Sequence, residues 1–188
     1  MWARYLAKVP RVRALLRRLI PLALLLLLAY WAYPYLRNGF RVVRLMGEPL
    51  PDTLPVPVEG VVPSDLVNTW GSARSEGRRH EGIDIFAPRN AQVLSATPGI
   101  VVRRGWNRLG GRVISVLGPG GYSHYYAHLE AWDLPEVGDW VEQGQVLGYV
   151  GNTGNAAGTP PHLHYGIYKG IGGHRGAINP YPLLTSRR

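Results

Sequence analysis

The chain has 188 residues and a formal net charge of +9, which indicates one domain with appended segments. The first 44 residues hold nine of the 21 lysines and arginines and no acid, so the rest is balanced, with 12 basic and 12 acidic side chains. A balanced main domain argues against nucleic-acid binding. The absence of cysteine excludes disulfides and thiolate ligands, so any metal must be held by histidine, aspartate or glutamate.

Residues 19–36 form an uncharged apolar stretch. As a helix rising about 1.5 Å per residue, the stretch would extend roughly 27 Å, close to the thickness of a bilayer core. Six basic residues precede it and three follow, so the positive-inside rule leaves the N-terminus in the cytoplasm. We therefore expect a basic cytoplasmic segment over 1–18, a transmembrane signal anchor over 19–36, and a single-pass inner-membrane protein whose main domain lies in the periplasm. Against a cleaved signal peptide stand the long basic region and the lack of a small-x-small site.

Residues 37–60 are expected to be a linker, because four prolines, at positions 49, 51, 55 and 57, favour extended backbone. From residue 61, short runs rich in valine, isoleucine and tyrosine alternate with glycine, proline and asparagine. This pattern is typical of strands joined by turns. The sequence predicts an all-β domain, an antiparallel β-sheet or sandwich, over residues 61–184, followed by a tail over 185–188.

The segment HEGIDI, residues 80–85, places His80 and Asp84 four positions apart. On a helix the two side chains would share a face and could hold a metal. However, Gly82, two isoleucines and the nearby Pro88 disfavour a helix. On a fully extended strand the two residues would be about 13 Å apart, too far to share one ion. We therefore expect the backbone to bend at Gly82.

A second histidine pair lies in GTPPHLHYGIY, where His162 and His164 point to the same face of a predicted strand. Their Cα atoms would be about 6.6 Å apart, so both could bind one metal, or one could act beside it. A catalytic zinc takes three histidine or carboxylate ligands and leaves one position for water. His80, Asp84 and one member of this pair would meet that count.

A third segment, YSHYYAHLE, is expected to alternate His124, Tyr126 and His128 onto one face of a strand. His124 and His174 are interpreted as structural histidines, because most histidines inside a fold are held by hydrogen bonds rather than by a metal. His128 has the same structural alternative when it is considered alone. The presence of HxxxD elsewhere favours a functional role.

Four separated motifs resemble, in the same order, those of peptidase family M23, the lysostaphin and LytM-type peptidoglycan hydrolases: HEGID (80–84), YAHL (126–129), VGNTGNAAGTPPHLHYGIY (150–168) and INPYPLL (178–184). The resemblance extends over roughly residues 60–184. Because several motifs agree, it is more specific than a single short pattern.

The resemblance implies an antiparallel β-sheet domain with a long groove and one zinc ion on its floor. It assigns His80, Asp84 and His164 as zinc ligands, and His128 and His162 as the catalytic pair. The expected activity is that of a zinc metalloendopeptidase which hydrolyses peptide cross-links of peptidoglycan through a metal-activated water. The two catalytic histidines would take up and return the proton, and which one is base and which is acid is left open.

Two further residues are candidates for contact with the substrate. TWGSAR resembles the aromatic-Gly-x-x-Arg element of the family, so Arg74 is expected to line the groove or to assist the carbonyl. Asn152 is the second candidate. We expect cleavage of stem-peptide bonds that contain D-amino acids, with a glycyl-glycine bond as the other option in the family. The expected partners are peptidoglycan, the lipid bilayer through the N-terminal helix, and a regulatory envelope protein, but no nucleic acid.

Three other interpretations were weighed. A non-catalytic M23-like scaffold that binds the cell wall or activates another hydrolase stays open, although the full set of expected ligands favours an active enzyme. GDWVEQGQVLGYV, residues 138–150, resembles the hairpin of biotinyl and lipoyl carriers, but neither Lys8 nor Lys169 lies in the required turn. GNTGNAAGT lacks the GK[ST] ending and the following helix of a phosphate loop.

Overall fold

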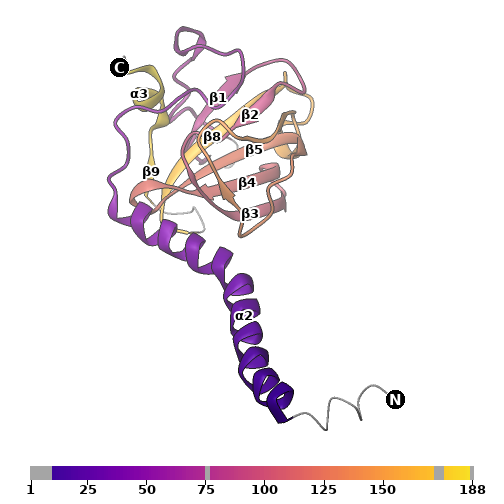
Figure 1. Cartoon of the computed structure of the whole chain (residues 1–188). Coiled ribbons are helices and arrows are strands. Elements are labelled where there is room, and N and C mark those ends of the chain that lie inside the picture. The colour runs from indigo at the N-terminus through magenta and orange to yellow at the C-terminus, as the bar shows by residue number, and fades with distance from the viewer. Residues whose placement is uncertain (1–9, 75–76, 172–175, 187–188) are drawn as a thin grey trace. The chain divides into compact units, whose positions relative to one another are not determined.

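The computed structural model describes residues 10–74, 77–171 and 176–186. The chain divides into two units, with the boundary between residues 41 and 42. In the described residues the first unit is helical, and the second contains the end of that helix and the β-sheet (Figure 1).

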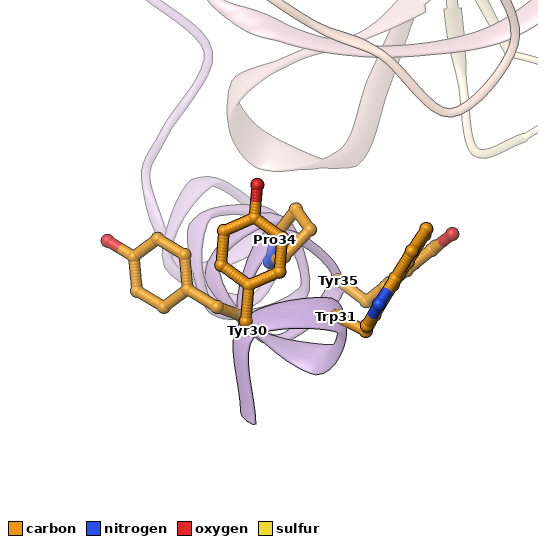
Figure 2. A pocket seen from close by; sticks show the side chains of 5 residues that line it. Tyr30, Trp31, Pro34 and Tyr35 are labelled. Carbon is orange, nitrogen blue, oxygen red and sulfur yellow. The ribbon is translucent and has the colours of Figure 1, made fainter. Parts of the chain in front are cut away.

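Helix α2 extends from Pro10 to Gly47 and contains two internal prolines. It continues eleven residues into the segment expected to be a linker and ends two residues before Pro49, where the proline-rich sequence can no longer supply the backbone donors of a helix. Aromatic side chains gather around the second internal proline, Pro34, and Figure 2 shows Tyr30 and Trp31 among those that project outward from the helix.

The expectation of a single-pass inner-membrane protein with a periplasmic domain is wrong, and so is the transmembrane anchor over 19–36. In the described parts of the chain, no helix combines the length and the apolar character needed to cross a membrane. The reason lies in the composition of the stretch, since its aliphatic part ends at Ala29 and tyrosine, tryptophan and proline occupy most of the next six positions. The aliphatic part spans only about 16 Å as a helix, roughly half of a bilayer core.

Among its described residues, the second unit contains an antiparallel β-sheet of nine strands. The strands are β1 (Ile83–Phe86), β2 (Gln92–Leu94), β3 (Gly99–Asn107), β4 (Gly111–Leu117), β5 (Tyr122–Trp132), β6 (Trp140–Val141), β7 (Val146–Val150), β8 (His162–Lys169) and β9 (Ala177–Ile178). Besides the end of α2, the described helical elements of this unit are short: η1 (Pro63–Asp65), η3 (Pro119–Gly121), η4 (Gly154–Ala156) and α3 (Pro180–Thr185). The prediction of an antiparallel β domain is confirmed, and the strands form one sheet.

The order of the main strands across the sheet is β1-β8-β5-β4-β3-β6, with β7 also paired to β5 and to β2, and β9 paired to β8 (Figure 1). This order places the HEGIDI strand beside the HLH strand, although some eighty residues separate them in sequence. The YAHL strand pairs with the other edge of the HLH strand. The sheet therefore brings all three histidine-containing segments together.

Residues alternate between the two sides of these strands. Ile83 and Ile85 of β1 and Leu163, Tyr165 and Ile167 of β8 are buried in one hydrophobic core. Segments 54–66, β2, β7 and α3 contribute to the same core. The residues in between, Asp84 and the two histidines of β8, necessarily lie on the opposite side of the sheet.

Candidate active site

Three side chains bring nitrogen and oxygen atoms to one point on this opposite side. The Nε2 atom of His80 lies 2.8 Å from Nδ1 of His164, and the Oδ1 atom of Asp84 lies 3.1 Å from the first nitrogen and 3.3 Å from the second. His80 and Asp84 are buried, and His164 is 14% exposed at its side chain. Among the described residues, this cluster is the group of histidine and carboxylate side chains placed to hold a metal ion.

The fold explains how residues so distant in sequence meet. Asp84 and His164 are register partners across β1 and β8. His80 lies before β1, and the chain bends at Gly82, as the sequence predicted. A Cβ atom at Gly82 would approach the carbonyl oxygen of Tyr165 to 2.5 Å and the His164 ring to 2.7 Å. Gly82 is therefore needed chiefly because the backbone passes close to β8.

Residues 69–74 contact the two expected metal ligands of HEGIDI, His80 and Asp84. Nδ1 of His80 donates to the carbonyl oxygen of Thr69 at 2.8 Å, which leaves the lone pair of Nε2 directed into the cluster. The Thr69 hydroxyl accepts the backbone N–H of Asp84 at 3.0 Å. Arg74 forms an ion pair with Oδ2 of Asp84, the oxygen turned away from the histidines. The TWGSAR segment thus fixes both the tautomer of His80 and the orientation of the Asp84 carboxylate.

The donor set fits a zinc ion. Two imidazole nitrogens and one carboxylate oxygen are ligands that catalytic zinc takes, and bonds of about 2.0 Å in a tetrahedron keep the donors roughly 3.3 Å apart. Burial alone would raise the pKa of Asp84, but its contacts with His164 and His80 outweigh burial and hold the pKa well below its usual value. Burial is also the main reason that the pKa of His164 is lowered. An ionised aspartate and a neutral histidine are the metal-binding forms.

His128 and His162 lie beside this cluster. Nδ1 of His128 donates to the carbonyl oxygen of Thr153, and Nδ1 of His162 donates to that of Pro160, both at 2.8 Å. In each ring Nε2 is therefore the nitrogen left to act. The two ring centroids are 5.0 Å apart, and Nε2 of His162 is 4.0 Å from Oδ1 of Asp84. Burial, followed by the charge of His164, lowers the pKa of His128 to about 4.

The expectation that His124, Tyr126 and His128 share one face of a strand is wrong. His124 and Tyr126 lie in the interior, where Nδ1 of His124 contacts the Tyr165 hydroxyl at 2.7 Å. Between Tyr126 and Leu129, β5 advances three residues while β4 advances two, so β5 contains a bulge. His128 lies in the bulge with a φ of 65°. The extra residue turns His128 to the side of the metal cluster.

The two residues expected to contact the substrate, Arg74 and Asn152, each bind other side chains of the protein. Arg74 contacts Asp84, as described above. Both ends of the Asn152 amide are engaged, since Oδ1 accepts from Arg89 at 2.7 Å and Nδ2 donates to the carbonyl oxygen of Thr159 at 3.0 Å. His174 lies outside the described residues. An exposed aromatic ring that the sequence did not single out, Phe86, has its centroid 5.3 Å from that of His162.

Two threonines around the site were also missed, Thr69 and Thr153. Each supports a histidine through its backbone carbonyl oxygen and a neighbouring backbone group through its hydroxyl. A backbone carbonyl gives no signal in a sequence, because every residue has one. The only sequence signal was their place within TWGSAR and GNTG.

Comparison with known proteins agrees with the resemblance read from the sequence. The profile described as peptidase family M23 matches residues 78–180. The L-Ala–D-Glu endopeptidase of Bacillus subtilis (strain 168) is 44% identical over 127 residues, which cover 63% of this chain and 39% of that protein. The peptidoglycan DD-endopeptidase ShyC of Vibrio cholerae is 34% identical over 97 residues, 49% of this chain and 22% of that protein. The chain thus spans well under half the length of these relatives.

Solved structures show the same architecture. The crystal structure of a putative glycyl-glycine endopeptidase lytM from Ruminococcus gnavus aligns with a TM-score of 0.59 and 34% sequence identity. The alignment covers 76% of this chain and 62% of that one. The antiparallel β domain and the arrangement of its strands are therefore shared with LytM-type folds.

Proposed function

Because the chain belongs to peptidase family M23, we propose that it is a zinc-dependent endopeptidase that hydrolyses peptide bonds of peptidoglycan, in stem peptides that contain D-amino acids. The observation that carries the proposal is the cluster of His80, Asp84 and His164, whose ligand atoms lie within 4.8 Å of one another. The two further histidines beside the cluster, each with a free Nε2, complete what amide hydrolysis requires.

The proposed roles follow from the contacts of each residue. His80, Asp84 and His164 would hold a zinc ion, which when bound supplies Lewis-acid activation of a water molecule and of the peptide carbonyl. His128 and His162 carry the proton transfers. Because backbone carbonyls fix the proton on both Nδ1 atoms, Nε2 is the atom that takes a proton from the water or delivers one to the leaving amine.

Burial prepares these histidines for their roles. The lowered pKa of His128, about 4, leaves its Nε2 unprotonated at neutral pH and therefore able to accept a proton. His128 and His162 are both 7% exposed, so little water competes for their hydrogen bonds. In such surroundings the charges of the site act more strongly than they would in water.

The target bond is proposed from chemistry and relatedness. One relative is named for the L-Ala–D-Glu bond and another for DD-endopeptidase activity on peptidoglycan, so stem-peptide bonds next to D-amino acids are the common class. The solved LytM-type neighbour is named for glycyl-glycine bonds, which form the second class to test. A peptidoglycan partner fits all three names better than a nucleic acid, for which the balanced β domain has no basic surplus.

The test is digestion of purified peptidoglycan by the full chain, with and without a chelator, followed by mass spectrometry of the soluble products. We expect soluble fragments whose new termini identify the cleaved bond, loss of the products with chelator, and recovery when zinc is returned. Fragments that form equally well with chelator would refute zinc dependence. A chain that digests nothing, but stimulates a separate hydrolase, would be a scaffold and not an enzyme.

A further inference from the structure

Strand β5 is held in an unusual conformation at His128. The residue has a φ of 65°, which is uncommon outside glycine and strained for a residue with a Cβ atom. It lies in the bulge, where one extra residue of β5 opposes β4. A bulge interrupts the ladder of backbone hydrogen bonds, so some other group must satisfy the backbone there.

The Thr153 side chain supplies that group. Arg112 of β4 and Leu129 of β5 are register partners just beyond the bulge. The hydroxyl of Thr153 lies between them: it accepts the backbone N–H of Arg112 at 3.0 Å and donates to the carbonyl oxygen of Leu129 at 2.9 Å. One side-chain oxygen therefore bridges the two strands where a direct ladder bond would otherwise be expected.

The same residue also holds the imidazole of His128. The Thr153 carbonyl oxygen accepts the Nδ1 proton of His128 at 2.8 Å, and the carbonyl oxygen of Gly110 accepts the backbone N–H of His128 at 2.7 Å. The loops that carry these two carbonyls pack backbone to backbone. A Cβ atom at Gly111 would lie 2.2 Å from the Thr153 hydroxyl, so only glycine fits there.

We propose that Thr153 is the positioning residue for His128: its hydroxyl bridges β4 and β5 at the bulge, and its carbonyl oxygen fixes the His128 ring with Nε2 toward the metal cluster. The inference rests on the proposed catalytic role of His128. It assigns the threonine of GNTG a function beyond forming the turn before the HLH strand. The metal ligands are carried by β1, β8 and the segment before β1, so their geometry does not depend on this hydroxyl.

The test compares three substitutions in the full chain. Thr153→Val keeps the shape and removes the hydroxyl, Thr153→Ser keeps the hydroxyl, and Thr185→Val is the matched control. Thr185 is half-buried in α3, and its hydroxyl donates to a backbone carbonyl at 2.8 Å, away from the site. Initial rates on purified peptidoglycan give kcat and KM, and competition with a chromophoric chelator gives zinc affinity.

We expect T153V to lower kcat about 10- to 100-fold, the scale of a displaced catalytic group, and to leave KM and zinc affinity within about twofold. T153S should recover kcat to within about threefold of the original chain, and T185V should match it. Equal kcat for T153V and the original chain would overturn the proposal. So would a T153S variant as slow as T153V, or a parallel loss of zinc affinity.

A second readout does not depend on hydrolysis. Nitrogen-15 NMR of labelled histidine distinguishes the two tautomers of a neutral ring. We expect Nδ1 of His128 to be protonated in the original chain and in T153S, and a mixed tautomer signal in T153V, or in Thr153→Ala if T153V does not fold. An unchanged tautomer in the variant refutes the positioning role. Inactivity of the unsubstituted chain would instead refute the proposed function.

Discussion

Two parts of strand β5, one before the bulge and one in it, each carry a histidine with a pKa lowered to about 4, yet the two histidines lie in different environments. His124 is fully buried in the interior, and its pKa is lowered by burial alone. His128 lies in the bulge, where the charges of His164 and His162 add to burial, while the Thr153 carbonyl and Asp84 oppose it. A shifted pKa therefore does not identify a functional histidine by itself.

What distinguishes the two residues is the partner available to the second ring nitrogen. Nε2 of His124 is buried and has no hydrogen-bond partner among the described residues, so an added proton there would be unsatisfied. The side of His128 that carries Nε2 faces the other histidines, with ring centroids 5.0 Å from His162 and 5.9 Å from His164. We therefore expect His124 to contribute to stability, and the geometry supports the proposed catalytic role of His128.

The largest effect expected from this comparison is on catalysis. His128→Gln should lower kcat roughly 100- to 10,000-fold, the usual contribution of a general acid or base, and should leave zinc affinity unchanged. His124→Gln should keep the turnover of the original chain within about twofold. Rates of peptidoglycan digestion by the two variants check this directly. If both variants lost activity equally, the functional division between His124 and His128 would be wrong.

A smaller effect is expected from the outer partners of the metal cluster. Arg74→Ala removes the ion pair with Asp84 and should weaken zinc binding about 10- to 100-fold, the typical cost of losing such a partner. Arg79→Ala is the matched control, because Arg79 donates to the carbonyl oxygen of Gly71 in the same segment without touching a ligand. Chelator competition measures both. Equal zinc affinities combined with a raised KM for Arg74→Ala would return Arg74 to the substrate role expected from the sequence.

The smallest effect concerns the contribution of the buried His124 to stability. The folded-state pKa of His124, about 4, lies below its ordinary value of 6.5, so the unfolded chain takes up the proton first as the pH falls. This contribution to stability is complete above pH 6.5 and is lost as the pH falls toward 4. Between pH 7.5 and 5.5 we expect a loss of about 1.4 kcal/mol.

Urea unfolding of the original chain and of His124→Gln at the two pH values measures the loss. The buried His128 and His164 are present in both proteins, so the difference between the two pH dependences isolates His124. Indistinguishable pH dependences would show that His124 is not held neutral in the folded state. That result would remove the contrast with His128.

Residue types and spacing predicted that His80 and Asp84 would lie beside one member of the His162–His164 pair, and the family resemblance selected His164, which the structure places in the cluster. His162 and His164 could be assigned to one face of a strand by the period of two, and Gly82 marked the bend between His80 and Asp84. The antiparallel β domain followed from the same short alternating runs. In these segments, local pattern and tertiary structure agree.

The features that escaped prediction depend on what a segment contacts. The bulge at His128 is defined by the register between β5 and β4, so the sequence of either strand alone does not indicate it. Thr69 and Thr153 act largely through backbone carbonyl oxygens, which every residue possesses. In the N-terminal segment, the length of the uncharged stretch suggested an anchor, but aromatic residues and proline occupy much of it and no helix in the described residues qualifies as a span.

The most direct test of the account is a zinc titration of the metal-free full chain, followed by the rate at which purified peptidoglycan releases soluble fragments. With His80, Asp84 and His164 as the ligands, the rate should rise from near zero and reach its plateau at one zinc per chain. Full activity in the metal-free chain would contradict the account. So would a chain that binds one equivalent of zinc and still releases nothing.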